Sequence, residues 1–303
     1  MRVRAFAKIN RSLRIVGVRP DGYHELRTEF QSIALHDTLS LRATRGPFGL
    51  TCDDPECPAD ATNLVRRAAV LAWAAAGRRG APRGVSIELT KRIPLRAGLG
   101  GGSSDAAAVL RALGKLWRID RRTLQAIAPS LGADVPYFFE GGRMLGVDRG
   151  DTLERLRDGR AAWVVLVIPG YGVSTADAYA WWDAADRSTR REPQGRPERR
   201  GTTRSGSPRA TSKRGPGVGL DQRGNDLQPV VAKRHPEIAG IVTALEKEGA
   251  WEAAMSGSGS AVFGLFAREA AALEAASVLL APGRRALVTR TLDRAAYQRL
   301  AGC

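Results

Sequence analysis

The sequence of 303 residues lacks any long hydrophobic run. Its longest uninterrupted apolar segment, Ala68 to Ala76, is far shorter than the roughly 18 residues that a membrane-spanning helix needs. The amino terminus also lacks the pattern of a signal peptide. We therefore expect a cytoplasmic protein with no membrane partner.

Cysteine and histidine are scarce, with three residues of each. The one close cysteine pair lies in the segment CDDPEC, and its alternatives to free thiols are a metal clip or a disulfide. A structural zinc site needs four ligands, however, and His24, His36 and His235 do not have the spacing of metal ligands. We therefore expect reduced thiols in a loop.

Acidic residues are too few to balance the basic ones, and the net charge is +16. Half of this charge lies at residues 187–219, where nine arginines and one lysine accompany two glutamates. Apolar residues are almost absent there, so the segment cannot offset the entropy of ordering itself. We expect a disordered basic insertion that forms a solvated loop, with weak contact to RNA or an anionic surface as the alternative. Because it has no interleaved aromatic residues, no specific nucleic acid is expected.

The rest of the chain mixes helix and strand patterns, and its length favours two domains. Alternation at 2–17, followed by the turn residues Arg19 to Gly22, predicts a strand, a turn and another strand. Further strands are expected at 85–89, 163–168, 262–266 and 286–292, and helices at 63–76, 105–117, 121–131, 176–185, 236–248 and 268–280. The pattern predicts an α+β protein.

A glycine-rich segment, Pro94 to Ser104, lies between a predicted strand and a predicted helix, and we call it the glycine loop. Its glycines would let the backbone approach a ligand, while Ser103 and Ser104 stand where a helix N-cap belongs. Free amides at a helix N-terminus, together with the helix dipole, bind phosphate. A flexible linker or a tight turn is the alternative for a glycine run alone.

Two common nucleotide-binding loops do not match the glycine loop. A Walker A loop ends in Gly-Lys-Ser/Thr, whereas this loop ends in Gly-Ser-Ser. The dinucleotide fingerprint requires a third glycine where Ser103 stands. A P-loop NTPase is therefore excluded, and a Rossmann oxidoreductase is disfavoured.

The segment PLRAGLGGGSSDAAA, starting at Pro94, is similar to the phosphate-loop signature of the GHMP kinase superfamily. Three further blocks have the order and spacing seen in the 4-diphosphocytidyl-2-C-methyl-D-erythritol kinases, namely AKIN at Ala7 to Asn10, RPDGYHEL at Arg19 to Leu26 and GADVPYFF at Gly132 to Phe139. A late segment, SGSGSAVFG from Ser256, resembles the third, glycine-rich motif of the family. Since the matches span nearly the whole chain, the sequence resembles this kinase family.

The resemblance implies a catalytic pair, Lys8 and Asp134. In the family the corresponding aspartate lies near the substrate hydroxyl as proton acceptor, and the lysine lies beside it. The residues agree with this assignment, because Lys8 is flanked by apolar residues and a cation there would be costly without a carboxylate or a ligand. Either residue alone could equally be an ordinary surface ion.

The resemblance also implies two binding regions. The cytidine diphosphate half of the substrate is assigned to Asn10, Tyr23 and His24, with Thr175 and Tyr179 as further candidates, since aromatic rings, an imidazole and an amide can stack on and read a pyrimidine. ATP is assigned to the glycine loop, that is to Pro94, Leu95, Arg96, Ala97, Gly98, Leu99, Gly100, Gly101, Gly102, Ser103 and Ser104.

The fold implied by the resemblance is a two-domain GHMP kinase. Residues 1–157 would form the ATP-binding domain, of the ribosomal-protein-S5-like type, and residues 158–303 a ferredoxin-like domain, with a cleft between them. The reaction would transfer phosphate from ATP, with Mg²⁺, to the 2-hydroxyl of the methylerythritol unit in the non-mevalonate (MEP) isoprenoid pathway. The alternatives are another GHMP kinase, of the mevalonate or homoserine type, and a basic RNA-binding protein.

Overall fold

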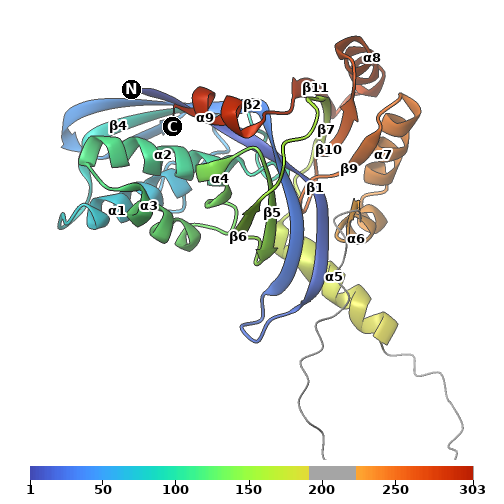
Figure 1. Cartoon of the computed structure of the whole chain (residues 1–303), viewed down its shortest axis with the longest axis horizontal. Helices are drawn as coiled ribbons and strands as arrows, with labels where there is room; N and C mark the ends of the chain where they lie inside the picture. Colours follow the sequence, from blue (N-terminus) through green and yellow to red (C-terminus); the bar gives the residue numbers. More distant parts are fainter. Residues whose placement is uncertain (191–222, 303) are drawn as a thin grey trace, which may run out of the picture.

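The computed structural model describes residues 1–190 and 223–302 (Figure 1). The basic segment expected to be disordered therefore lies largely outside the described residues, but its first residues, 187–190, are helical. The strands are β1 (Arg2–Val18), β2 (His24–Pro47), β3 (Gly49–Cys52), β4 (Arg83–Thr90), β5 (Arg143–Asp148), β6 (Thr152–Arg155), β7 (Trp163–Pro169), β8 (Gly224–Asn225), β9 (Glu252–Met255), β10 (Val262–Phe266) and β11 (Arg284–Arg290).

The helices alternate with these strands. They are α1 (Leu64–Ala75), α2 (Gly101–Trp117), α3 (Arg121–Ile127), α4 (Tyr137–Glu140), α5 (Thr175–Arg190), α6 (Gln228–Arg234), α7 (Glu237–Lys247), α8 (Glu269–Leu279) and α9 (Arg294–Ala301), with a 3-10 turn, η1, at Ala128–Ser130. Within the described residues, no helix is both long and apolar enough to cross a bilayer.

The first sheet is built on the long antiparallel pair of β1 and β2. Its strand order is β3-β4-β2-β1-β8, and β5 pairs with the first part of β2 and with β6. The second sheet has the order β11-β7-β10-β9. In Figure 1 the helices α1 to α4 lie beside the first sheet, whereas α7 and α8 lie beside the second.

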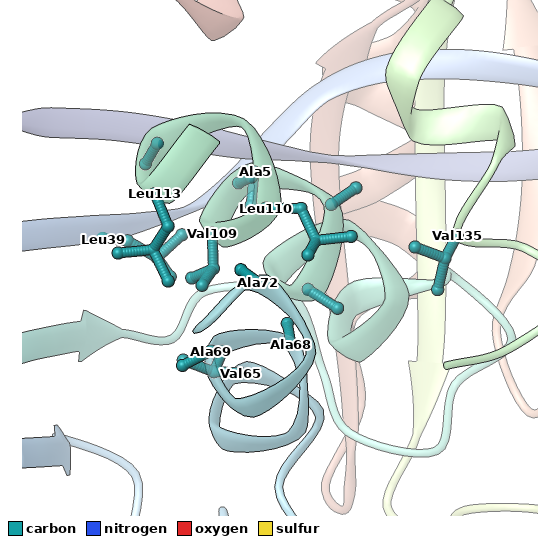
Figure 2. Packing of buried hydrophobic residues seen from close by; sticks show 14 of the residues in the cluster. Ala5, Leu39, Val65, Ala68, Ala69, Ala72, Val109, Leu110, Leu113 and Val135 are labelled. Atoms are coloured by element: carbon teal, nitrogen blue, oxygen red, sulfur yellow. The ribbon is translucent and has the colours of Figure 1, made fainter. Parts of the chain in front are cut away.

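The helices α1 and α2 pack closely because α1 presents small side chains. Ala68, Ala69 and Ala72 are fully buried against Val109 and Leu110 of α2 (Figure 2). Asn63 caps α1 by accepting a hydrogen bond from the Val65 amide at 2.8 Å. This packing fixes α2, and with it the end of the glycine loop.

A second core joins the two sheets. Ala7 and Ile9 of β1 are buried together with Val164 and Leu166 of β7 and with Leu99 of the glycine loop. The middle of β1 is therefore covered on both faces, and the alternation of its sequence understates its burial. The glycine loop lies between the two sheets.

Several predicted boundaries shift for physical reasons. The helix expected at 121–131 ends at Ile127, and Pro129 falls in η1, as expected for a residue that cannot donate the helical hydrogen bond. The helix predicted at 105–117 begins earlier, at Gly101. Helix α5 extends to Arg190, beyond the predicted 176–185.

Candidate active site

The strand β1 carries Lys8 and Asn10 on a short segment between two irregularities. Its register against β2 shifts between Phe6 and Lys8 and again between Asn10 and Ser12. Such bulges re-aim side chains and are common beside active sites. Lys8 and Asn10 both face the cavity described below, because residues two apart on a strand share a face.

The Lys8 ammonium has three acceptors from three parts of the chain. It donates to Asn10 Oδ1 at 2.6 Å and to the Gly98 carbonyl at 3.0 Å, and it pairs with Asp134 Oδ2 at 3.3 Å. Lys8 is 4% exposed, whereas Asp134 is 32% exposed. The charge of Lys8 is thus held inside the protein, while the carboxylate reaches the solvent side.

A short relay fixes the amide of Asn10. The Thr28 hydroxyl donates to the Ser12 carbonyl at 2.7 Å, and Asn10 Nδ2 donates to Thr28 Oγ1 at 2.7 Å. The amide oxygen of Asn10 is thereby turned toward Lys8. Asn10, expected to bind substrate, is therefore engaged in orienting the ammonium.

The glycine loop makes close backbone contacts at Gly98 and Gly100. A Cβ on Gly98 would lie 2.0 Å from the Ser256 carbonyl oxygen, and one on Gly100 would lie 2.9 Å from the Phe138 ring and 3.1 Å from the Lys8 stem. Both glycines also have φ near +70°, which L side chains rarely adopt. A side chain at either position would displace the loop from Lys8.

Helix α2 starts at the end of the glycine loop. Its N-cap is Gly100, and the first helical bond runs from the Ser104 amide to the Gly100 carbonyl at 2.9 Å. The amides that precede Ser104 have no helical partner and are available to an anion. The helix thus begins one turn before the position expected from Ser103 and Ser104, and those serines are not its N-cap.

Ser104 does not face the ligand side of the loop. Its hydroxyl donates to the Phe6 carbonyl at 2.7 Å, and the residue is 1% exposed. Ser104 ties α2 to β1, which carries Lys8. Of the residues assigned to ATP, Pro94 through Ser103 all line the cavity, and Ser104 is not among its lining residues.

A cavity of about 760 Å³ joins these groups. Its lining includes Lys8, Asn10 and Asp134 beside the glycine loop, and the start of α5 on the other side. Asp134 lies in the turn between η1 and α4, directly after the Pro129 break. The predicted catalytic pair and the glycine loop are therefore brought to one site.

The start of α5 forms a further wall. Thr175 and Tyr179 both line the cavity, and the Thr175 hydroxyl lies 3.1 Å from that of Ser258. The Tyr179 ring stacks on His24 with centroids 4.7 Å apart, and His24 Nε2 lies 2.8 Å from Asp183 Oδ1. Burial, and then the nearby Asp134 carboxylate, raise the pKa of Tyr179 well above its usual range.

Tyr23 and His24 were predicted to bind substrate, but they are not among the residues that line the cavity. Tyr23 is 59% exposed, and its ring lies 5.1 Å from the guanidinium of Arg149, which does line the cavity. His24 reaches the site only through Tyr179. Both residues lie at its edge, at the start of β2 or just before it.

Sequence reasoning missed several lining residues, among them Thr28, Lys91, Arg149 and Ser258. Lys91 stands just before the glycine loop, and Ser258 lies in the late SGSGSAVFG segment, so the sequence held a signal for both. Thr28 and Arg149 reach the site only because β2 and β5 pair across the sheet.

Neither Cys52 nor Cys57 is among the residues that line the cavity. Cys52 and Cys57 are free thiols, and burial together with the neighbouring Cys52 raises the pKa of Cys57 to about 12. In the parts of the chain that the structure describes, no group of three or more histidine, cysteine or acidic side chains is arranged to hold a metal ion. Cys303 lies outside those parts.

Comparison with known proteins agrees with this geometry. Residues 63–142 match the GHMP kinases N terminal domain, and residues 214–285 match the GHMP kinases C terminal family. The chain is 40% identical to the 4-diphosphocytidyl-2-C-methyl-D-erythritol kinase of Pelotomaculum thermopropionicum, over 95% of this chain and 97% of that protein. It is 41% identical to the kinase of the same name from Solibacter usitatus, over 98% of this chain and 92% of that protein.

Solved structures give the same result. A crystal structure of 4-(cytidine 5'-diphospho)-2C-methyl-D-erythritol kinase matches with a TM-score of 0.73 and 32% identity, over 96% of this chain and 99% of that one. The homoserine kinase of Cytophaga hutchinsonii shares the fold, with a TM-score of 0.63 at 18% identity, over 96% of this chain and 95% of that one. The α+β GHMP kinase fold is thereby confirmed, and the chain belongs to the 4-diphosphocytidyl-2-C-methyl-D-erythritol kinase family of GHMP kinases.

Proposed function

We propose that this protein transfers the γ-phosphoryl group of ATP to the 2-hydroxyl of 4-diphosphocytidyl-2-C-methyl-D-erythritol, in the non-mevalonate (MEP) route to isoprenoids. The observation that carries the proposal is the meeting of Lys8, Asp134 and the glycine loop in one cavity. The names of the relatives support the choice of acceptor alcohol.

In this proposal the acceptor hydroxyl lies against Asp134. The hydroxyl oxygen forms a bond to the γ-phosphorus, the bond from that phosphorus to the bridging oxygen breaks, and ADP leaves. The proton of the hydroxyl passes to Asp134. Phosphoryl transfer has a loose transition state, so orientation of the hydroxyl contributes as much as its deprotonation. Lys8, held by Asn10 and Gly98, holds the Asp134 carboxylate in place.

The triphosphate would lie along the glycine loop, with its oxygens on the free amides at the start of α2. Mg²⁺ would be held mainly by phosphate oxygens and water, as is usual for this ion at nucleotide sites, and it would offset charge on the transferring group. Asp134 would stay with the acceptor hydroxyl, and the cavity of about 760 Å³ leaves room for phosphate oxygens and water around the ion. The residues present therefore fit such an ion without a protein cage.

The cytidine half would lie toward α5 and the β1–β2 turn. Tyr179 and Thr175 supply a ring and a hydroxyl within the cavity, and Tyr23 and His24 flank it. We further propose that residues 1–157 hold the nucleotide and residues 158–303 complete the cleft, in a cytoplasmic enzyme with no specific nucleic-acid partner.

A coupled assay of ADP release tests the proposal. Purified protein should consume ATP with 4-diphosphocytidyl-2-C-methyl-D-erythritol and leave mevalonate and homoserine untouched. Turnover of either of the latter at a comparable kcat/KM, with none of the cytidine substrate, would refute the assigned substrate while leaving the kinase class intact.

A further inference from the structure

Three buried charged side chains lie beneath the glycine loop and take no part in the reaction proposed above. Lys91 directly follows β4, Asp37 belongs to β2, and Asp105 lies in the second turn of α2. Each is more than nine-tenths buried. Charges are costly to bury unless they are paired and hydrogen-bonded, so this grouping requires an explanation.

Lys91 binds both carboxylates. Its ammonium donates to Asp105 Oδ2 at 2.9 Å and forms a short hydrogen bond to Asp37 Oδ2. Burial lowers the pKa of Lys91 and the carboxylates of Asp105 and Asp37 raise it, with a net rise, so the ammonium stays charged at neutral pH. Lys91 thereby links β2 to α2.

Asp37 also fixes the backbone that enters the glycine loop. Its other oxygen, Oδ1, accepts from the amide of Arg92 at 2.5 Å and from that of Ile93 at 2.8 Å. These two amides immediately precede Pro94, the first residue of the loop. One carboxylate therefore anchors the entry of the loop through two backbone amides and one ammonium.

Asp105 belongs to the element at the other end of the loop. It lies four residues after Gly101, the first residue of α2, and so on the same face of the helix. A Cβ on Gly101 would lie 3.3 Å from Lys91 Nζ, which shows how closely the helix start rests on the ammonium. Lys91 also lines the cavity beside the loop.

We infer that Lys91, Asp37 and Asp105 form a positioning triad that holds the entry and the exit of the glycine loop together and thereby sets its affinity for the nucleotide. The inference rests on the proposed function, because it takes the glycine loop as the ATP site. Lys8 and Asp134 lie outside the triad, so the triad should govern nucleotide binding more than the chemical step or the binding of the alcohol.

The test replaces Lys91 with Met, which keeps the length of the side chain and removes its charge. Titration calorimetry with Mg²⁺ and ADP should show a Kd raised about tenfold or more, since breaking a buried ion pair costs several times RT. In steady state the KM for ATP should rise by a similar factor, while the KM for the alcohol stays within about twofold of wild type. Lys91→Arg, which keeps the charge, should recover part of the affinity.

Lys115→Met is the matched control, because Lys115 is an exposed residue of α2 that donates to the Gly302 carbonyl, away from the triad. It should bind ADP as wild type does. A folded Lys91→Met protein with wild-type ADP affinity overturns the inference, and so does an equal rise in both KM values, which would indicate general loosening. If Lys91→Met does not fold, Asp105→Asn measured at pH 8, above the raised pKa of Asp105, decides: a several-fold rise in the Kd for ADP is expected, and an unchanged Kd overturns the inference.

Calorimetry with ADP separates this inference from the proposed function. A wild-type protein that binds ADP but does not phosphorylate the cytidine substrate contradicts the proposed function alone. A wild-type protein that turns over that substrate, with triad variants that bind ADP normally, contradicts the triad alone.

Discussion

Two lysine–aspartate groupings lie on either side of the glycine loop, and they differ in access to solvent. Lys91 and its two carboxylates are each no more than 3% exposed at the side chain, whereas Asp134, beside Lys8, is 32% exposed. We call Lys91, Asp37 and Asp105 the closed grouping, because its carboxylates are buried and are taken up in holding chain segments together. We call Lys8 and Asp134 the open grouping, because its carboxylate is partly exposed and can meet a substrate.

The two groupings also differ in what surrounds the ammonium. Lys8 is held by an amide oxygen, a backbone carbonyl and one carboxylate, so only one of its partners carries charge. Lys91 is held by two carboxylates. The difference predicts that the first grouping sets turnover and the second sets stability and nucleotide affinity.

The largest expected effect is on turnover at the open grouping. Asp134→Asn and Lys8→Ala should each lower kcat by about 10² to 10⁴, the range contributed by positioned acid–base groups. Circular dichroism and ADP binding should remain close to wild type. Near-normal turnover of either purified variant would show that the open grouping is not catalytic.

Stability should give the opposite ranking. Lys91→Met leaves two buried carboxylates unpaired and should lower the free energy of unfolding by about 3–5 kcal/mol. Lys8→Met removes the donor to the Asn10 amide oxygen and one of the two donors to the Gly98 carbonyl, at a cost of about 1–3 kcal/mol, while Asp134 keeps contact with water. Urea unfolding measures both free energies. A loss for Lys8→Met equal to or larger than that for Lys91→Met would show that the two groupings do not differ in their contribution to stability.

The pH dependence of stability should identify the closed grouping further. Burial raises the pKa of Asp105, Lys91 lowers it and Asp37 raises it again, and it reaches about 7. Because this is above the unfolded value, the contribution of Asp105 to stability is full below the unfolded pKa and is lost as the pH rises toward about 7. Relative to wild type, Asp105→Asn should therefore become more stable between pH 5 and pH 8 by a few kcal/mol at most. A stability difference that does not change with pH in urea titrations would contradict the raised pKa.

The smallest effect is expected at an exposed ion pair. Arg42 and Glu88 lie 3.5 Å apart on neighbouring strands, with side chains 73% and 52% exposed. Arg42→Ala should change the free energy of unfolding by less than about 1 kcal/mol and leave turnover unchanged. A loss of unfolding free energy as large as that of Lys91→Met would show that burial does not determine how much an ion pair contributes to stability.

The resemblance to the kinase family, carried by short sequence blocks, predicted which segments would form the open grouping. The glycine loop, the strand that carries Lys8 and the turn that carries Asp134 each have a recognisable sequence, and the structure brings them together. The helix start was predicted one turn late, because the glycines that suggested a loop are themselves helical. The close contacts of Gly98 and Gly100, just before the helix, are with Ser256 and Phe138, which are distant in sequence.

The closed grouping could not be predicted in this way. Asp37 lies 54 residues before Lys91, and Asp105 lies 14 residues after it, so no short motif contains all three. Their meeting follows from the pairing of β2 with β4 and from the packing of α2 on the sheet. The edge position of Tyr23 and His24 likewise depends on the docking of α5, through the contacts of His24 with Tyr179 and Asp183.

The carbonyl oxygen of Gly98 has two donors, the ammonium of Lys8 and the hydroxyl of Ser256, which follows the last residue of β9. The Gly98 peptide therefore connects the second sheet to Lys8 through two hydrogen bonds. If the two sheets moved apart, one of these two hydrogen bonds would lengthen. The Lys8 ammonium would then lose the Gly98 carbonyl as an acceptor or move with that carbonyl. Any separation of the two sheets would therefore change the contacts of the ammonium that pairs with Asp134.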